Sequence, residues 1–87
     1  MEGKRKRIMD RFKRIEGQLR GLQNMVANEG RWEDILIQVA AVTAAMKRAG
    51  AAIVEAYLEE CLQKARQKPE EALADFRKIL TRYMDLA

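Results

Sequence analysis

Histidine and serine are both absent from the 87 residues of this chain, and cysteine and proline each occur once. Without histidine the chain lacks the commonest metal ligand and the commonest general base. Nucleophile–histidine dyads and triads are therefore excluded, and a lone cysteine cannot close an internal disulfide. We expect a protein that is not an enzyme.

Turn-forming and aromatic residues are also scarce, with five glycines and an aromatic share of 6%. A β-sandwich or barrel needs turn residues at short intervals and many β-branched or aromatic residues, so the composition favours an all-α fold. No run of 18 consecutive apolar residues occurs, and the basic start does not lead into an apolar signal core. We therefore expect a cytoplasmic protein with no membrane span.

Charge is concentrated at one end of the sequence. Residues 1–14 carry seven basic and two acidic side chains, whereas the remaining 73 residues carry ten basic and eleven acidic ones. The net charge of +4 therefore resides entirely near the N-terminus. Such asymmetry indicates a polyanionic partner.

Apolar residues recur at alternating spacings of four and three, which predicts three helices. The first apolar seam runs from Ile8 to Val26, and its helix should end near Ala27, where Asn28 and Gly30 tolerate a left-handed cap. The second helix is expected over residues 33–64, with Gly50 in its interior. Pro69 then suits the first turn of a third helix that ends near Met84. The whole of 1–87 is expected to form a single domain.

The second helix poses a packing problem. Its 32 residues would be about 48 Å long, whereas a compact chain of this size has a radius of gyration of only about 12 Å. One protomer cannot cover such a rod, so we expect an antiparallel four-helix-bundle dimer built from the first two helices of each chain. The third helix is then available to join two dimers into a homotetramer. The alternative is a three-helix monomer that kinks at Gly50.

A basic stripe is predicted along the first helix. On a helical wheel one narrow stripe beside the apolar seam holds Lys4, Arg7, Arg11, Arg14 and Gln18. Guanidinium groups bind phosphate through planar, bidentate hydrogen bonds, which makes DNA the expected partner. Arg48, within an alanine-rich part of the second helix, is a further candidate. The alternatives are an ordinary solvated face, or a helical adaptor that docks on an acidic protein or membrane surface.

Two segments carry a family resemblance. RFKRIEGQLRG at residues 11–21 and DILIQVAAV at residues 34–42 closely resemble the signature of the CsoR/RcnR family of metal- and thiol-sensing transcriptional repressors. The likeness extends from about Arg11 to Leu62. It implies an all-helical dimer of antiparallel hairpins, paired into a tetramer, that binds double-stranded operator DNA without a helix-turn-helix. The DNA-contacting arginines of the family fall on Arg11 and Arg48.

The same resemblance places an effector pocket at Trp32, Tyr57 and Cys61, where copper-sensing members carry a cysteine, a histidine and a cysteine. Only Cys61 keeps a metal-binding group here, because indole has no lone pair for a metal and a neutral phenol is a poor soft ligand. Cu(I) or another metal could still bind a degenerate site of Cys61 with Met25, Met46 or Glu60. Cys61 is otherwise a buried packing residue or a thiol sensor. The sequence names no inducer.

Overall fold

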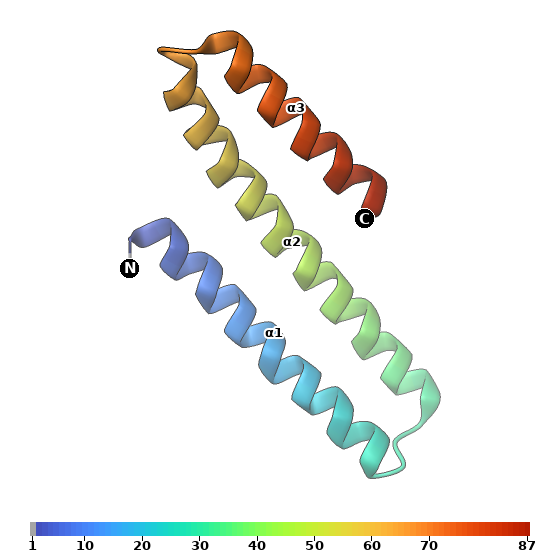
Figure 1. The fold of residues 1–87 in the computed structure, drawn as a ribbon. Coiled ribbons are helices and arrows are strands. Elements are labelled where there is room, and N and C mark those ends of the chain that lie inside the picture. The colour runs from blue at the N-terminus through green and yellow to red at the C-terminus, as the bar shows by residue number, and fades with distance from the viewer. Residues whose placement is uncertain (1) are drawn as a thin grey trace. The chain divides into compact units, whose positions relative to one another are not determined.

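The computed structural model describes residues 2–87 and consists of three helices (Figure 1). They are α1 (Gly3–Ala27), α2 (Trp32–Ala65) and α3 (Pro69–Leu86). No strand occurs among the described residues, so the all-α prediction is confirmed. The predicted end of α1 and both predicted ends of α2 agree with the structure to within one residue.

The start of α1 lies before its first apolar residue. The Glu2 carboxylate caps the helix, accepting hydrogen bonds from the backbone amides of Arg5 at 2.7 Å and Lys4 at 3.1 Å. These bonds hold the pKa of Glu2 below its usual value, the Arg5 amide being the largest cause. Because the cap precedes the basic segment, Lys4 and Arg7 belong to α1. The whole basic stripe therefore lies on one helix.

The end of α1 differs in detail from the prediction. Asn28 is the C-cap and has a negative φ, and the left-handed residue is Glu29, with φ 59°. The next residue must be a glycine such as Gly30, because a Cβ at this position would lie 2.9 Å from the carbonyl oxygen of Met25. The sequence therefore located the turn correctly but assigned the left-handed conformation to the wrong residues.

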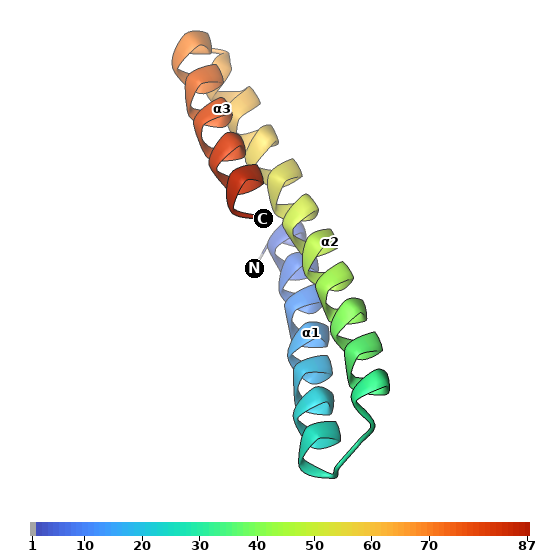
Figure 2. The same cartoon turned by 90° about the vertical axis from the view of Figure 1, so that its right-hand side faces the viewer.

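The chain divides into two compact units, one extending to Ala51 and the other formed by Ala52–Ala87. In the first, α1 runs antiparallel beside the first part of α2 (Figures 1 and 2). Its buried core is formed by Ile15, Val42 and Ala49. Three partly buried residues pack against this core, namely Phe12, Leu22 and Ala45. The predicted seams of the first two helices thus meet each other in one protomer.

In the second unit, α3 folds back beside the last part of α2 (Figures 1 and 2). Pro69 occupies the first turn of α3, where its missing amide hydrogen costs no helical hydrogen bond. Cys61 of α2 and Ala72 of α3 are buried. The rings of Tyr57 and Phe76 pack with their centroids 5.8 Å apart and their planes inclined by 31°. An aromatic contact therefore joins the two helices of this unit.

α2 is 34 residues long and continues through Gly50. It contains an 18-residue window that is long and apolar enough to cross a membrane, although only 11% of that window is buried in the protomer. This is weak evidence for a membrane span, because the core helix of a soluble protein passes the same test. The apolar excess does show that much of α2 is uncovered in a single chain.

Candidate nucleic-acid interface and effector position

The basic stripe predicted from the sequence lies on the surface of α1. Arg7, Arg11, Arg14 and Gln18 are exposed, and Lys4 is half-buried. Ile15, the one buried residue of α1, faces α2. Arg11 and Gln18 lie four and three residues from Ile15 and so adjoin the buried seam, yet both are exposed. The packing of the first unit therefore leaves the stripe accessible.

Carboxylates pair with two of the cations on another side of α1, whereas three arginines of the stripe form no such pair. Lys6 pairs with Asp10 at 3.3 Å, and Arg20 pairs with Glu16 at 3.6 Å. Within residues 2–87 no carboxylate forms an ion pair with Arg7, Arg11 or Arg14. Three guanidinium groups thus present uncompensated charge along one helix.

Arg48 is exposed on α2, in the same compact unit as the stripe. It directly precedes Ala49, which is completely buried, so its side chain projects about 100° around the helix from the core. It forms no ion pair with any other described residue. Arg48 is therefore available to an anionic partner.

Two glycines interrupt the polar surface of α1. A Cβ added at Gly17 or Gly21 would meet nothing within 4 Å, so neither glycine is required by packing in one protomer. Each costs about 1 kcal/mol relative to alanine in a helix interior. Their presence leaves a strip of α1 backbone open to close approach by a further molecule.

Cys61 and Tyr57, two of the three predicted effector-pocket residues, adjoin one another on α2. Cys61 is 7% exposed, and it lies one helical turn after Tyr57, so the two side chains are neighbours on α2. Desolvation is the largest cause that raises the pKa of Tyr57, and the hydrogen bond to Cys61 is the second. Tyr57 is therefore a neutral phenol over the physiological pH range.

Trp32, the third predicted pocket residue, lies at the start of α2 in the first unit and is 70% exposed. Trp32 and Tyr57 are the two aromatic residues at positions where the family resemblance places metal ligands. In the structure Tyr57 does pack, and its partner Phe76 was not anticipated. Phe76 could have been found from the apolar spacing of α3, which places it on the face that meets α2.

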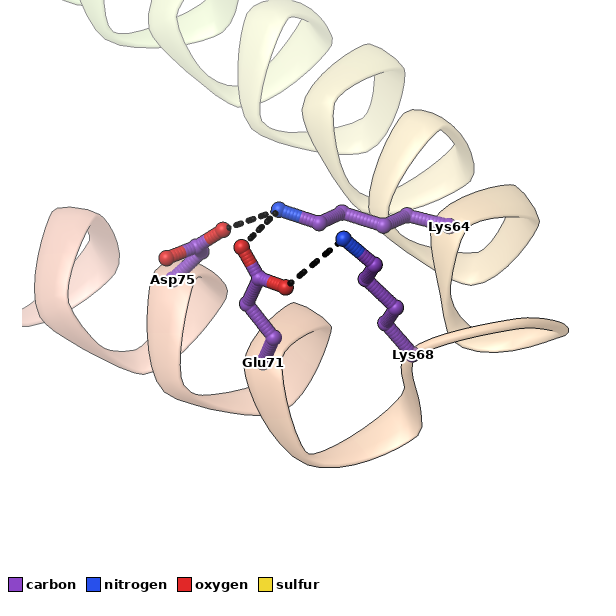
Figure 3. A network of polar contacts seen from close by, with 4 residues as sticks. All are labelled: Lys64, Lys68, Glu71 and Asp75. Atoms are coloured by element: carbon purple, nitrogen blue, oxygen red, sulfur yellow. Dashed lines mark hydrogen bonds and ion pairs between the residues drawn. The ribbon is translucent and has the colours of Figure 1, made fainter.

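An ion-pair network that the sequence analysis missed fastens α3 to α2 (Figure 3). Lys64 Nζ lies 2.7 Å from Asp75 Oδ2 and 3.1 Å from Glu71 Oε1, and Lys68 Nζ lies 3.8 Å from Glu71 Oε2. The hydrogen bonds that Lys64 donates to Asp75 and, as the second cause, to Glu71 raise the pKa of Lys64 to about 12. Glu71 and Asp75 are four residues apart, so both reach the same lysine from one face of α3.

The known proteins that resemble this chain in sequence include transcriptional repressors. Residues 4–82 match the family described as "Metal-sensitive transcriptional repressor". The chain is 48% identical over 58 residues to the copper-sensing transcriptional repressor CsoR of Bacillus subtilis (strain 168), an alignment that covers 67% of this chain. It is 33% identical over 55 residues to the copper-sensing transcriptional repressor RicR of Mycobacterium tuberculosis, over 63% of this chain. The chain spans 57% of the length of each of these curated relatives.

Two solved structures share the fold. The nickel-responsive transcriptional regulator InrS superposes with a TM-score of 0.81 at 34% identity, covering 90% of both chains. The Cu(I)-bound copper-sensing repressor CsoR of Geobacillus thermodenitrificans NG80-2 superposes with a TM-score of 0.78 at 34% identity, covering 91% of this chain and 84% of the other. The fold, the signature segments and the match over residues 4–82 agree. The chain belongs to the family of metal-sensitive transcriptional repressors, which are not enzymes.

Proposed function

We propose that this protein is a cytoplasmic transcriptional repressor that binds double-stranded operator DNA through the basic stripe of α1 together with Arg48. The observation that carries the proposal is the uncompensated charge of Arg7, Arg11 and Arg14, beside cations of the same helix that are paired with carboxylates. Phosphates attract such groups strongly, and each contact releases condensed counterions. Lys4 and Gln18 extend the same stripe.

The proposal includes self-association. Trp32, Leu36, Val39 and Met46 are all exposed and follow one stripe of α2 at heptad spacing. A second copy would cover this stripe and bring two basic stripes into one assembly, as in the antiparallel four-helix-bundle dimer expected from the sequence. Exposed apolar residues of α3, including Leu73 and Met84, would then serve a contact between dimers in a homotetramer.

Alanine substitution tests the DNA-binding residues. Arg11→Ala and Arg48→Ala should each weaken binding to DNA from upstream of the protein's own coding sequence, measured by gel shift with nonspecific competitor. Loss of a bidentate arginine contact to a base costs about 1–3 kcal/mol, and loss of a phosphate contact weakens binding to all sequences alike. Arg20→Ala is the matched control, because Arg20 is paired with Glu16 away from the stripe.

The control variant should bind as the unmodified protein does. Normal binding by both Arg11→Ala and Arg48→Ala would refute the assignment of these residues. If the unmodified protein ignores the DNA but binds anionic lipid vesicles or an acidic protein through the same stripe, the adaptor function replaces the repressor.

A further inference from the structure

The sequence of this chain offers few of the ligands that copper and nickel prefer. Copper and nickel appear in the names of the relatives and solved structures. Cu(I) prefers soft thiolate and thioether ligands, and imidazole suits copper and nickel. No histidine and only one cysteine occur in the sequence. Every further copy in a homo-oligomer adds the same single thiol and no imidazole, so assembly cannot supply the missing groups.

The structure also lacks a cluster of other side chains that could replace the missing thiol and imidazole ligands within residues 2–87. Residues 2–87 contain no group of three or more histidine, cysteine, aspartate or glutamate side chains placed to hold a metal ion. The carboxylates that α3 brings towards α2, Glu71 and Asp75, are held by Lys64. They are also hard oxygen ligands, which suit Mg²⁺, Ca²⁺ or Mn²⁺ rather than Cu(I).

The surroundings of Cys61 are those of a packing residue. Its side chain is buried, and Tyr57 precedes it by one turn on the same face of α2. Tyr57 in turn packs against Phe76 of α3. The carboxylates that act on Tyr57, those of Asp75 and Glu60, are hard oxygen ligands and do not suit Cu(I).

We propose that this chain is a metal-independent member of its family, in which the Tyr57–Cys61–Phe76 cluster is a structural contact between α2 and α3 and takes neither Cu(I) nor Ni(II). The inference concerns the regulation of the repressor and in that respect rests on the proposed function. A ligand shifts a conformational equilibrium only through different affinities for the two states. A chain that does not bind these metals cannot be released from DNA by them.

Direct metal titration tests the inference without DNA. The reduced, full-length protein is titrated anaerobically with Cu(I) in competition with a chromophoric Cu(I) chelator, and with Ni(II) by equilibrium dialysis. We expect no stoichiometric binding of either metal and no ultraviolet thiolate-to-copper charge-transfer band. Stoichiometric Cu(I) binding that Cys61→Ala abolishes, whether one metal per chain or one per pair of chains, would overturn the inference.

A gain-of-function variant tests its structural cause. Trp32→Cys combined with Tyr57→His places a thiol and an imidazole at the two positions where the resemblance puts metal ligands. We expect this variant to gain stoichiometric Cu(I) binding and the charge-transfer band, and to lose both when Cys61→Ala is added. Tyr57→His alone is the milder variant should the double substitution reduce the helical circular dichroism signal. A folded double variant that binds no Cu(I) would contradict the assignment of the replaced positions.

Operator binding with and without metal separates the two proposals. If the unmodified protein binds its upstream DNA, we expect the same affinity with and without Cu(I) or Ni(II). A loss of affinity on adding either metal, reversed by chelator and absent in Cys61→Ala, would overturn the inference and leave the repressor function intact. If the protein binds no DNA, the proposed function fails, and the metal titration still decides whether the chain takes metal.

Discussion

The backbone amide of Gly30 donates a hydrogen bond to the carbonyl oxygen of Met25 at 2.7 Å and so closes the end of α1. The amide of Glu29 donates to the Val26 carbonyl at 3.3 Å in the same turn. Together these bonds form a Schellman motif, whose left-handed position is usually glycine. Glutamate occupies that position here. The turn between α1 and α2 is therefore formed at some conformational cost.

Replacing the left-handed residue should stabilise the protein. The left-handed conformation costs a residue with a side chain about 1–2 kcal/mol, and glycine recovers this at an entropic cost of about 0.5–1 kcal/mol. We expect Glu29→Gly to raise the free energy of unfolding by up to about 1 kcal/mol. Urea denaturation at fixed protein concentration measures the change.

The adjacent glycine provides the contrasting control for this prediction. Gly30→Ala should destabilise the protein, because its Cβ would lie 2.9 Å from the Met25 carbonyl oxygen. If Glu29→Gly lowered the stability as Gly30→Ala does, the Schellman geometry of this turn would be wrong.

The ion pairs of Lys64 should stabilise the packing of α3 on α2. Lys64→Met keeps most of the aliphatic side chain but removes the charge that binds Asp75 and Glu71. We expect a lower thermal unfolding midpoint for this variant in low salt, and a smaller difference from the unmodified protein in high salt, because partly exposed pairs are screened. Circular dichroism melts at several salt concentrations measure both.

The pH dependence of this difference follows from the raised pKa of Lys64. A cation whose pKa is raised in the folded state contributes its full stability below the unfolded value of 10.5, and loses it as the pH rises through about 12. The unmodified protein should therefore exceed Lys64→Met by a constant margin from neutral pH to about 10 and by none above about 12. A margin that disappears near neutral pH would show that the Lys64 ion pairs are not its source.

Periodicity was sufficient to predict the three helices, because apolar seams and the single proline determine where helices of this length form. The basic stripe was equally predictable, since residues at helical spacing on α1 share a face whatever the helix packs against. Glu29 was not predictable, because the cap bonds of the turn impose its conformation and its side chain gives no signal. Single-domain organisation of residues 1–87 stays a prediction.

Contacts between helices were harder to predict from the sequence. The Tyr57–Phe76 contact and the Lys64 network depend on how far α3 folds back beside α2, which the local pattern does not determine. The sequence did contain the residues of the network. Lys64 lies seven and eleven residues before Glu71 and Asp75, so the turn at Pro69 can bring the lysine and the two carboxylates to facing sides of α2 and α3. The roles of the predicted DNA-binding and effector residues remain predictions.

Self-association through α2 can be tested with one buried charge. Leu36 is 68% exposed in the protomer, so Leu36→Glu leaves the core of a single chain intact but places a carboxylate in the proposed contact between copies. Burying an unpaired charge is strongly unfavourable. We expect the unmodified protein to sediment as a dimer or tetramer and Leu36→Glu to dissociate at the same concentration.

The matched control for the dimer is Gln38→Glu, which adds the same charge to an exposed position about 160° around α2 from Leu36. It should sediment as the unmodified protein does. If the unmodified protein sediments as a single chain, the proposed dimer is contradicted. If Leu36→Glu sediments as the same oligomer as the unmodified protein, the contact between copies lies elsewhere.

The dependence of DNA affinity on salt distinguishes a phosphate contact from a purely structural role for Arg11. Each phosphate that the protein neutralises contributes about −0.9 to the slope of the logarithm of the binding constant against the logarithm of salt concentration. We expect Arg11→Ala to make this slope less negative by about 0.9, and Arg20→Ala, whose guanidinium is paired with Glu16, to leave it unchanged. Fluorescence anisotropy titrations at several salt concentrations measure all three slopes. If Arg11→Ala weakened binding equally at every salt concentration, Arg11 would act on DNA through the structure of α1 and not through a phosphate.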